Sequence, residues 1–507
     1  MLKRNLVANY LGHGWTALME LAFIPLYIKY LGVEAYGLIG VFAVLRAWLV
    51  LLDMGLKPTL GREMARLTGG ATTPAAIRDL LRTVEIISLG LAILLALGIW
   101  AASDWLASEW LRAAELPVDT VARAIAIMGI VTALRFVEGI YNSCLIGLQR
   151  QVLYNVINSA LATLRGAGAV AVLAWVAPTI NAFFIWQGLV SLLSLSVLAG
   201  TTYLALPKAR HSGRFSLSAL HGVSRFASGM VAITFLSLLL TQVDKMLLSK
   251  LLTLTDFGYY TLASTLASGA LTVLIGPVNQ AWFPRLSQLH AANDTPGLIR
   301  CYHQGAQLVS VIAGSATFVM MAFAETVLNL WTQDVALSAR VAPILSLLVL
   351  GNLLNGLMWI PYQTQLAYGL TGLAVWVNII AVAIIVPAML WATPRYGAEG
   401  AAWAWVSLNA GYVLLGIHFM YRRILHTEKW RWYRDDVIQP LLAAGAAVLL
   451  VRWLIPPPVG MLPQLFALSV AAFTALFFAT LAAPSVRHKA MNVLNAVLTR
   501  RIEAKQP

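Results

Sequence analysis

Long apolar segments recur along almost the whole chain, separated by short polar connections. Each segment is about 20 residues long, the length that an α-helix needs to cross the roughly 30 Å hydrocarbon core of a bilayer. The pattern predicts an all-α polytopic membrane protein with about fourteen transmembrane helices. The predicted spans are 9–30, 36–56, 83–102, 121–147, 152–175, 179–204, 226–251, 257–279, 304–330, 338–361, 370–392, 398–421, 436–454 and 463–482.

The composition agrees with this pattern and excludes a soluble protein. Hydrophobic residues make up 60% of the chain and charged residues 11%, whereas soluble domains contain about 25% charged residues. A bilayer accommodates so much apolar surface because lipid replaces water as the solvent. The two cysteines, Cys144 and Cys301, have no metal-ligand spacing, and we predict neither a disulfide, a metal site nor a cofactor.

The charge is strongly positive, because 35 lysines and arginines outnumber 21 acidic residues by 14. The basic residues gather in alternate connections, as the positive-inside rule describes, so we expect an even number of spans, both termini in the cytoplasm and no nucleic-acid partner. Residues 421–436 mix cations with aromatic residues, which suits the lipid headgroup layer. An ordinary positive-inside loop explains this segment equally well.

A short internal repeat relates two parts of the chain. Residues 31–45 align with 252–266, so that Tyr36-Gly37 corresponds to Phe257-Gly258 at an offset of 221. Six predicted spans separate the copies, and an even number preserves orientation, so we predict a parallel pseudo-two-fold axis along the membrane normal. Further downstream, Leu60-Gly61-Arg62 corresponds to Phe283-Pro284-Arg285.

From this repeat we predict that the chain has four parts and the architecture of a transporter. These are an N-terminal six-span bundle (1–206), a cytoplasmic linker (207–225), a C-terminal six-span bundle (226–425), and two additional spans with a basic cytoplasmic tail (426–507). Two bundles that face each other are typical of alternating-access transporters. Prolines bend helices, and those predicted to lie within spans are Pro25, Pro277, Pro361 and Pro387.

Several ionisable residues fall at membrane depth, where each costs roughly 2.5–3.5 kcal/mol on insertion scales. We predict that the cations line a hydrated cavity and bind an anionic group, because the planar fork of arginine donates two parallel hydrogen bonds to phosphate. We assign the acidic residues to ion coupling or charge pairing. The cations are Arg46, Arg165, Arg135 and Lys245, and the acidic residues are Glu20, Glu138 and Asp244.

Pairing within the membrane is the alternative explanation. Arg135 and Glu138 are spaced for contact on one helix, Glu20 and Arg46 have similar predicted depth, and Asp244 and Lys245 could extend to the membrane surface. Arg165 has no acidic neighbour within its own span. The second bundle offers mainly amides, which could contact sugar or join helices: Gln280, Asn352, Asn355, Gln363, Asn378 and Asn409.

Residues 24–37 resemble the opening of bacterial polysaccharide biosynthesis flippases. These O-antigen and exopolysaccharide translocases belong to the multidrug/oligosaccharidyl-lipid/polysaccharide exporter (MOP) superfamily. The order of spans is also similar to that of the family. Further similar segments are Leu52-Asp53-Met54-Gly55-Leu56, Gly61-Arg62-Glu63, Asp244-Lys245 and Gly258-Tyr259-Tyr260.

This resemblance implies a flippase that moves undecaprenyl-pyrophosphate-linked oligosaccharide across the bacterial inner membrane by alternating access. It implies cavity cations that hold the pyrophosphate, a role that Arg46, Arg135, Arg165 and Lys245 match by depth. It also implies coupling to a proton or sodium gradient and association with polysaccharide polymerase machinery. The last two spans resemble the lipid-groove helices of peptidoglycan-precursor flippases.

Two other functions fit a polytopic membrane protein. A multidrug or cation antiporter of the same superfamily would be expected to have acidic residues in its cavity, whereas mid-span arginines dominate here. A membrane polysaccharide polymerase or ligase would need a large outer loop, and the longest one predicted covers only about residues 103–120. We therefore predict a transporter and not an enzyme.

Overall fold

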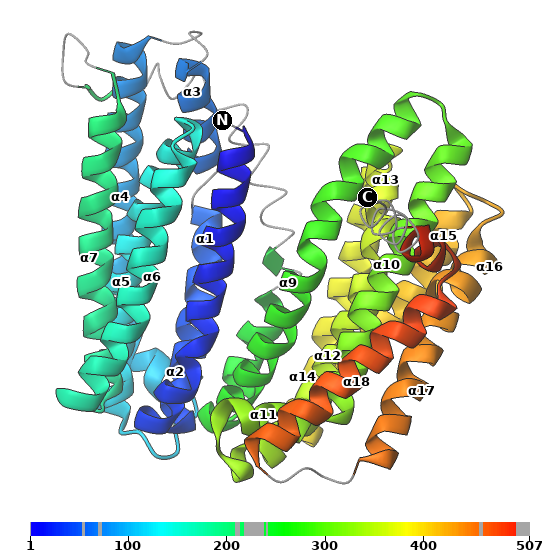
Figure 1. The fold of residues 1–507 in the computed structure, drawn as a ribbon. Helices are drawn as coiled ribbons and strands as arrows, with labels where there is room; N and C mark the ends of the chain where they lie inside the picture. The colour runs from blue at the N-terminus through cyan, green and yellow to red at the C-terminus, as the bar shows by residue number, and fades with distance from the viewer. Residues whose placement is uncertain are drawn as a thin grey trace, which may run out of the picture. The chain divides into compact units, whose positions relative to one another are not determined.

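The computed structural model describes residues 2–52, 56–68, 73–207, 213–216, 238–239, 242–455 and 460–492. These residues are almost entirely helical (Figure 1), which confirms the predicted all-α class. Ten of the described helical segments are long and apolar enough to cross a membrane. Most of the predicted linker 207–225, much of the predicted span 226–251 and the tail beyond residue 492 lie outside the described residues, so the count of fourteen stays a prediction.

The chain divides into two compact units, Met1–Gly258 and Tyr259–Pro507. In the first unit α5 is central, because it packs against α2, α3, α4, α6 and α7, while α1 packs along α6. A π-helical turn, Leu106–Trp110, follows α4. The helices of this unit are α1 (Leu2–Ala22), α2 (Ile24–Leu52), α3 (Leu56–Thr68), α4 (Pro74–Trp105), α5 (Val118–Gly147), α6 (Gln151–Trp175) and α7 (Ile180–Ala205).

In the second unit α10 is central and contacts α12, α17 and α18. Its start is capped by Asp294, whose carboxylate accepts a hydrogen bond from the backbone N–H of Gly297 at 2.8 Å. The helices are α9 (Leu254–Ala291, which begins in the first unit), α10 (Thr295–Ala322), α11 (Ala324–Thr332), α12 (Val335–Leu357), α13 (Trp359–Ala367), α14 (Thr371–Gly411), α15 (Ile417–Tyr421), α16 (Lys429–Arg431), α17 (Gln439–Leu454) and α18 (Met461–Ala482). Two π-helical turns, Tyr412–Gly416 and Trp432–Ile438, complete it.

Two glycines with positive φ angles divide continuous helical segments. Gly32 (φ 81°) interrupts α2 and separates the first predicted span from the second. Gly397 (φ 60°) interrupts α14 between the predicted spans 370–392 and 398–421. Glycine adopts this backbone conformation without the steric penalty that a side chain would add. Each of these two helices therefore contains parts of two predicted spans.

Two of the span prolines coincide with helix breaks. Proline cannot donate a backbone hydrogen bond to the residue four positions before it. α2 begins one residue before Pro25, and α13 begins two residues before Pro361. In contrast, α14 continues through Pro387, and the side chain of Pro277 lies outside the described residues.

The repeated aromatic-glycine pairs form a reciprocal helix contact. A β-carbon added at Gly37 would collide with the backbone oxygen of Leu254, and one added at Gly258 would collide with that of Val33. Leu254 and Gly258 lie 221 positions after Val33 and Gly37, so the contact is unchanged when the two segments exchange roles. This local two-fold relation supports the parallel repeat predicted from the sequence.

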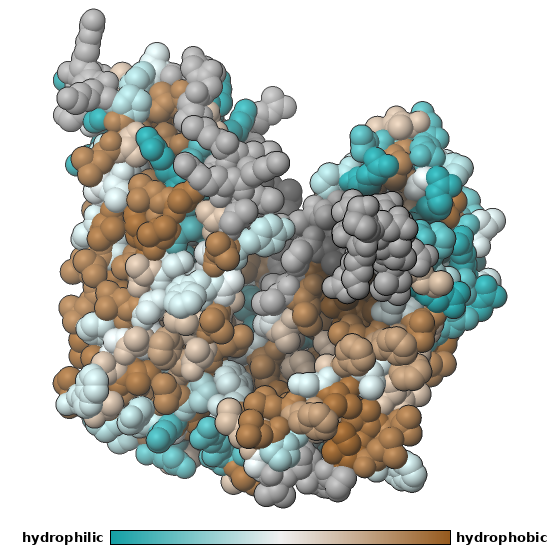
Figure 2. All heavy atoms as spheres, in the orientation of Figure 1, coloured by the Kyte–Doolittle hydropathy of each residue, from teal (hydrophilic) through white to brown (hydrophobic). Residues whose placement is uncertain are grey.

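The outward surface of each unit is apolar over a broad band. Figure 2 shows hydrophobic residues over the sides of the helices and more hydrophilic residues towards the helix ends. On α4 this surface includes the exposed side chains of Leu89, Leu94 and Trp100, and on α18 it includes Phe466 and Phe473. Such surfaces are stable against lipid and not against water.

The last two long helices pack closely through small residues. Ala467, Ala471, Ala475 and Ala479 recur every fourth position on α18, and all four are fully buried. They allow the backbones of α17 and α18 to approach closely, as small residues do in other transmembrane helix pairs. Large apolar side chains cover the opposite face of α18.

Candidate functional site

Five of the seven predicted site residues lie together in the first unit. They come from four helices: Glu20 from α1, Arg46 from α2, Arg135 and Glu138 from α5, and Arg165 from α6. The guanidinium of Arg135 interacts electrostatically with the other four charged groups. We call these five residues the arginine cluster.

The closest opposite charges in this cluster are Arg165 and Glu138, whose Nη2 and Oε2 atoms are 3.9 Å apart. The prediction that Arg165 has no acidic neighbour in its own span holds, but α5 supplies one. Their side chains are only 18% and 10% exposed. Nevertheless, Nε and Nη2 of Arg165 and Oε2 of Glu138 have no hydrogen-bond partner among the described residues. The ion pair is therefore a loose one.

Neither of the other predicted pairs in the cluster forms a salt bridge in the described part of the chain. Arg135 does not bond to Glu138 on its own helix; its Nη2 instead donates a hydrogen bond to Gln187 of α7 at 3.4 Å, and its Nε has no described partner. Glu20 and Arg46 are both exposed and do not form a salt bridge. Pairing within the membrane thus accounts for Arg165 in part, whereas Arg46 and Arg135 form no salt bridge with a described acidic residue.

One aromatic ring lies close to two of the arginines. The guanidinium carbons of Arg46 and Arg135 are 5.9 and 5.7 Å from the ring centre of Phe42. The face of an aromatic ring attracts cations, and Phe42 is itself fixed by an edge contact with Phe184 at 5.4 Å. The ring thus helps to hold two like charges near each other inside the bundle.

The cluster has the charge and the donors to bind an anion. Three arginines and two glutamates leave a formal charge of 3 − 2 = +1. Buried guanidinium N–H groups without partners are costly, and a ligand with several acceptor oxygens would satisfy them.

The structure does not join Lys245 to the arginine cluster. Lys245 and Asp244 lie in the helical segment 242–251, where both are half-buried. Lys245 is not among the described charged groups that interact with the guanidinium groups of Arg135 and Arg165. Its role in binding stays a prediction.

Three of the predicted amides of the second unit join helices. Asn355 of α12 donates a hydrogen bond to Asn409 of α14 at 2.9 Å, and Trp405 of α14 donates to Asn352 of α12 at 2.9 Å. These contacts confirm, for these residues, the alternative that span amides connect helices. The side chain of Gln280 lies outside the described residues.

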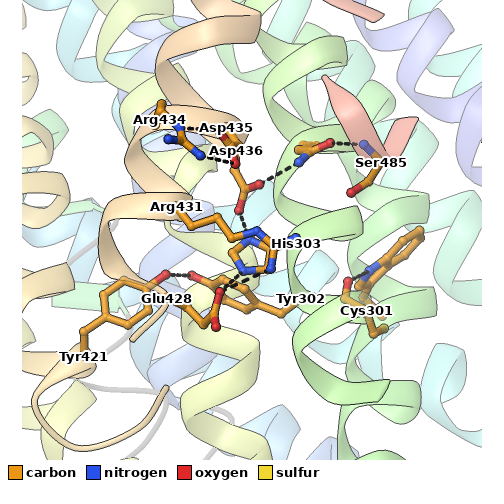
Figure 3. Close-up of polar contacts among 12 residues, drawn as sticks. Cys301, Tyr302, His303, Tyr421, Glu428, Arg431, Arg434, Asp435, Asp436 and Ser485 are labelled. Atoms are coloured by element: carbon orange, nitrogen blue, oxygen red, sulfur yellow. Dashed lines mark hydrogen bonds and ion pairs between the residues drawn. The ribbon is translucent and has the colours of Figure 1, made fainter. Parts of the chain in front are cut away.

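A second buried polar group, which the sequence interpretation missed, lies in the second unit (Figure 3). His303 of α10 contacts Asp436 through Nδ1 at 2.5 Å and Glu428 through Nε2 at 2.9 Å. Asp436 also accepts a hydrogen bond from Gln307 at 2.8 Å, and Gln307 accepts one from the backbone N–H of Ser485 at 2.8 Å. We call this group the histidine network. It connects α10 with the segment before α17 and the segment after α18.

This network adds a structural role to residues 421–436, for which the sequence suggested a headgroup segment or an ordinary loop. Asp436 and Trp432 are fully buried, so part of the segment belongs to the protein core. The sequence contained one indication of this network: His303 and Gln307 are four residues apart and therefore lie on the same face of one helix. Their partners come from more than 100 positions away, and the sequence pattern does not identify them.

Glu428 lies just before the candidate span Lys429–Leu454. Burial alone would raise the pKa of its carboxyl group, but the hydrogen bond with His303 and the charges of His303 and Arg431 hold this pKa below its usual value. Glu428 therefore favours its ionised form in the folded protein.

Solved structures of transporters have a similar fold. The lipid II flippase MurJ in an inward closed conformation matches with a TM-score of 0.68 and 12% identity, over 94% of this chain and 98% of that one. An inward-facing multidrug resistance MATE family transporter of the MOP superfamily matches with a TM-score of 0.60 and 16% identity, over 82% and 96%. A MOP superfamily transporter from Pyrococcus furiosus, described as having a binding pocket of reverse polarity, matches at 0.51 and 14%, over 84% and 95%.

Sequence comparison identifies the family. A search of curated proteins found no significant match. The family described as "Polysaccharide biosynthesis protein" matches residues 29–334, which is more than half of the 507 residues. This chain therefore belongs to the polysaccharide biosynthesis protein family, and it has the fold of the MOP superfamily transporters.

Proposed function

We propose that this protein is a flippase that moves undecaprenyl-pyrophosphate-linked oligosaccharide across the bacterial inner membrane for the synthesis of surface polysaccharide. The arginine cluster carries this proposal, because it has a net positive charge and contains buried guanidinium nitrogens, on Arg135 and Arg165, that have no hydrogen-bond partner among the described residues. A pyrophosphate group supplies the negative charge and the acceptor oxygens that these groups lack. Membership of a polysaccharide biosynthesis family supports the same substrate class.

In this proposal the pyrophosphate competes with Glu138 for Arg165. The ion pair at 3.9 Å has no hydrogen bond in the described structure, so a charged ligand with better geometry can replace it. Arg46 and Arg135, held near Phe42, would contact the second phosphate. Glu20 is the exposed carboxylate of the cluster, and we assign it to coupling with a proton or sodium gradient.

The remaining parts of the substrate would lie against other surfaces. The lipid tail would border the apolar faces of α17 and α18, which are exposed in this structure. Lys245 would contact the substrate in a further step of transport. We place both termini in the cytoplasm and expect the protein to deliver its substrate to polysaccharide polymerase machinery in the membrane.

Deletion of the gene tests the proposal in cells. A strain without the protein should lose surface polysaccharide and accumulate lipid-linked repeat units on the cytoplasmic side of the membrane. The wild-type gene should restore both properties. Normal surface polysaccharide in the deletion strain would contradict the proposal, and a drug-sensitive strain with intact polysaccharide would favour a multidrug antiporter.

A further inference from the structure

A second group of cations surrounds a cavity in the second unit, outside the arginine cluster. The cavity has a volume of about 370 Å³, within the range of small-molecule sites. Arg285 comes from the end of α9, Arg300 from the start of α10 and Lys489 from the helical segment 484–492. Three segments that are separate in sequence therefore bring positive charges to one cavity.

The charge of this cavity is not balanced within the described part of the chain. Arg285 donates a hydrogen bond to the neutral amide of Gln288 at 2.8 Å. Across the described ranges, none of the three cations forms a salt bridge. The one acidic lining residue is Asp294, which caps α10. Three cations and one carboxylate leave a formal charge of 3 − 1 = +2.

The wall of the cavity is fixed and partly apolar. The indole N–H of Trp282 donates a hydrogen bond to the backbone oxygen of Cys301 at 3.0 Å, and Leu289 is buried beside it. The sulfur of Cys301 lies near enough to Arg285 and Lys489 to interact with both charges. Figure 3 shows Cys301 next to His303 on α10, with His303 directed to the histidine network. Cys301 and His303 therefore lie on different sides of α10, one at the cavity and the other in the histidine network.

We propose that this cavity binds a phosphate group, carried either by the headgroup of an anionic membrane lipid or by a soluble phosphate compound. Guanidinium groups donate paired hydrogen bonds to phosphate oxygens, and lysine adds a compact charge. Basic pockets between transmembrane helices bind anionic headgroups on the cytoplasmic side, where the positive-inside pattern places Arg285 and Arg300. Trp282 suits the same depth. This site does not depend on the flippase proposal, because its residues are not those of the arginine cluster.

Direct binding to the purified full-length protein tests the site. Native mass spectrometry compares phosphatidylglycerol with phosphatidylcholine, and calorimetry measures inorganic phosphate and pyrophosphate. The Arg285→Gln/Arg300→Gln variant removes two charges from the cavity. Arg423→Gln is the matched control, because Arg423 is exposed and lies outside the cavity. We expect at least tenfold weaker binding in the double variant and unchanged binding in the control.

Protection of a thiol gives a second readout. Cys301 lines the cavity, whereas Cys144 is fully buried, so bound ligand should slow the labelling of Cys301 by a maleimide. Preferential binding of phosphatidylglycerol would identify a lipid headgroup, and binding of the inorganic anions would identify a soluble phosphate. If the double variant melts at a lower temperature, Lys489→Gln replaces it. Equal binding of both lipids without binding of the inorganic anions, or equal affinity in the cavity variants and wild type, would overturn the proposal.

Discussion

The two units each bury a group of charged and polar side chains, but they satisfy these groups differently. In the histidine network both ring nitrogens of His303 face carboxylates, and both oxygens of Asp436 have partners. In the arginine cluster, three guanidinium nitrogens have no hydrogen-bond partner among the described residues, namely Nε of Arg135 and Nε and Nη2 of Arg165. The first arrangement is complete without a ligand, and the second is not.

We interpret this difference as one between a structural role of the histidine network and the proposed binding role of the arginine cluster. A buried polar group that is fully hydrogen-bonded stabilises one arrangement of the segments around it. A group with buried unpaired donors costs free energy in the absence of a ligand, and it persists where binding compensates that cost. Burial and charge alone therefore do not set the proposed binding site apart from the histidine network. The completeness of the hydrogen bonding distinguishes the two groups.

The largest effect on transport is expected in the arginine cluster. Arg165→Ala or Arg46→Ala should abolish transport at normal protein levels, because each would remove the proposed charge-assisted hydrogen bonds to the pyrophosphate, worth roughly 1.5–3 kcal/mol apiece. Lysine should restore only part of the activity, since it lacks the planar fork. Surface polysaccharide in the complemented deletion strain measures the effect. Arg123→Ala is the control, because Arg123 is exposed on α5 outside the cluster. Lower membrane levels of the alanine variants would favour a structural role instead.

Substitutions in the histidine network should lower the stability of the protein and leave transport almost unchanged. His303→Ala leaves the buried Asp436 without its shortest contact, and we expect the free energy of unfolding to fall by roughly 2–5 kcal/mol. Thermal unfolding of the purified protein measures this loss. Transport per folded molecule should remain close to wild type. A stable variant that does not transport would assign the network to function.

Removal of the one carboxylate that competes for Arg165 should have a smaller effect. Glu138→Gln raises the formal charge of the cluster from +1 to +2, so pyrophosphate should bind several-fold more tightly and the transport rate should fall through slower release. Calorimetry measures the affinity, and the complementation assay measures transport. Glu85→Gln is the control, because Glu85 is also buried in the first unit but contacts Tyr141 and Tyr203. Weaker binding in Glu138→Gln would contradict the competition between ligand and carboxylate.

The smallest effect that we expect is on the pH dependence of the melting temperature, through Glu428 of the histidine network. Because the pKa of Glu428 is lowered in the folded protein, its ionised form stabilises the fold above its unfolded pKa of about 4.3. This contribution is lost as the pH falls through the lower folded value. The melting temperature of wild type should therefore fall more steeply below this pH than that of Glu428→Gln. Parallel curves for the two proteins would show that Glu428 contributes nothing through its charge.

The sequence predicts the helices well, because the hydropathy of each span depends on its own residues. The predicted span 152–175 corresponds to α6 (Gln151–Trp175), and 463–482 corresponds to α18 (Met461–Ala482). The position of Arg165 near the middle of α6 was also predictable. Its contact with Glu138 was not, because a hydropathy pattern does not show which faces of α5 and α6 meet. The histidine network was missed for the same reason, since its partners come from segments far apart in the chain.

We propose that the arginine cluster binds the pyrophosphate of the substrate. Calorimetry with a short-chain polyprenyl pyrophosphate linked to a sugar, added to the purified wild-type protein and to Arg46→Gln/Arg165→Gln, measures this binding. We predict that the double variant binds at least tenfold more weakly than wild type while it melts at the same temperature. Equal affinity of the two proteins for this ligand would contradict the claim.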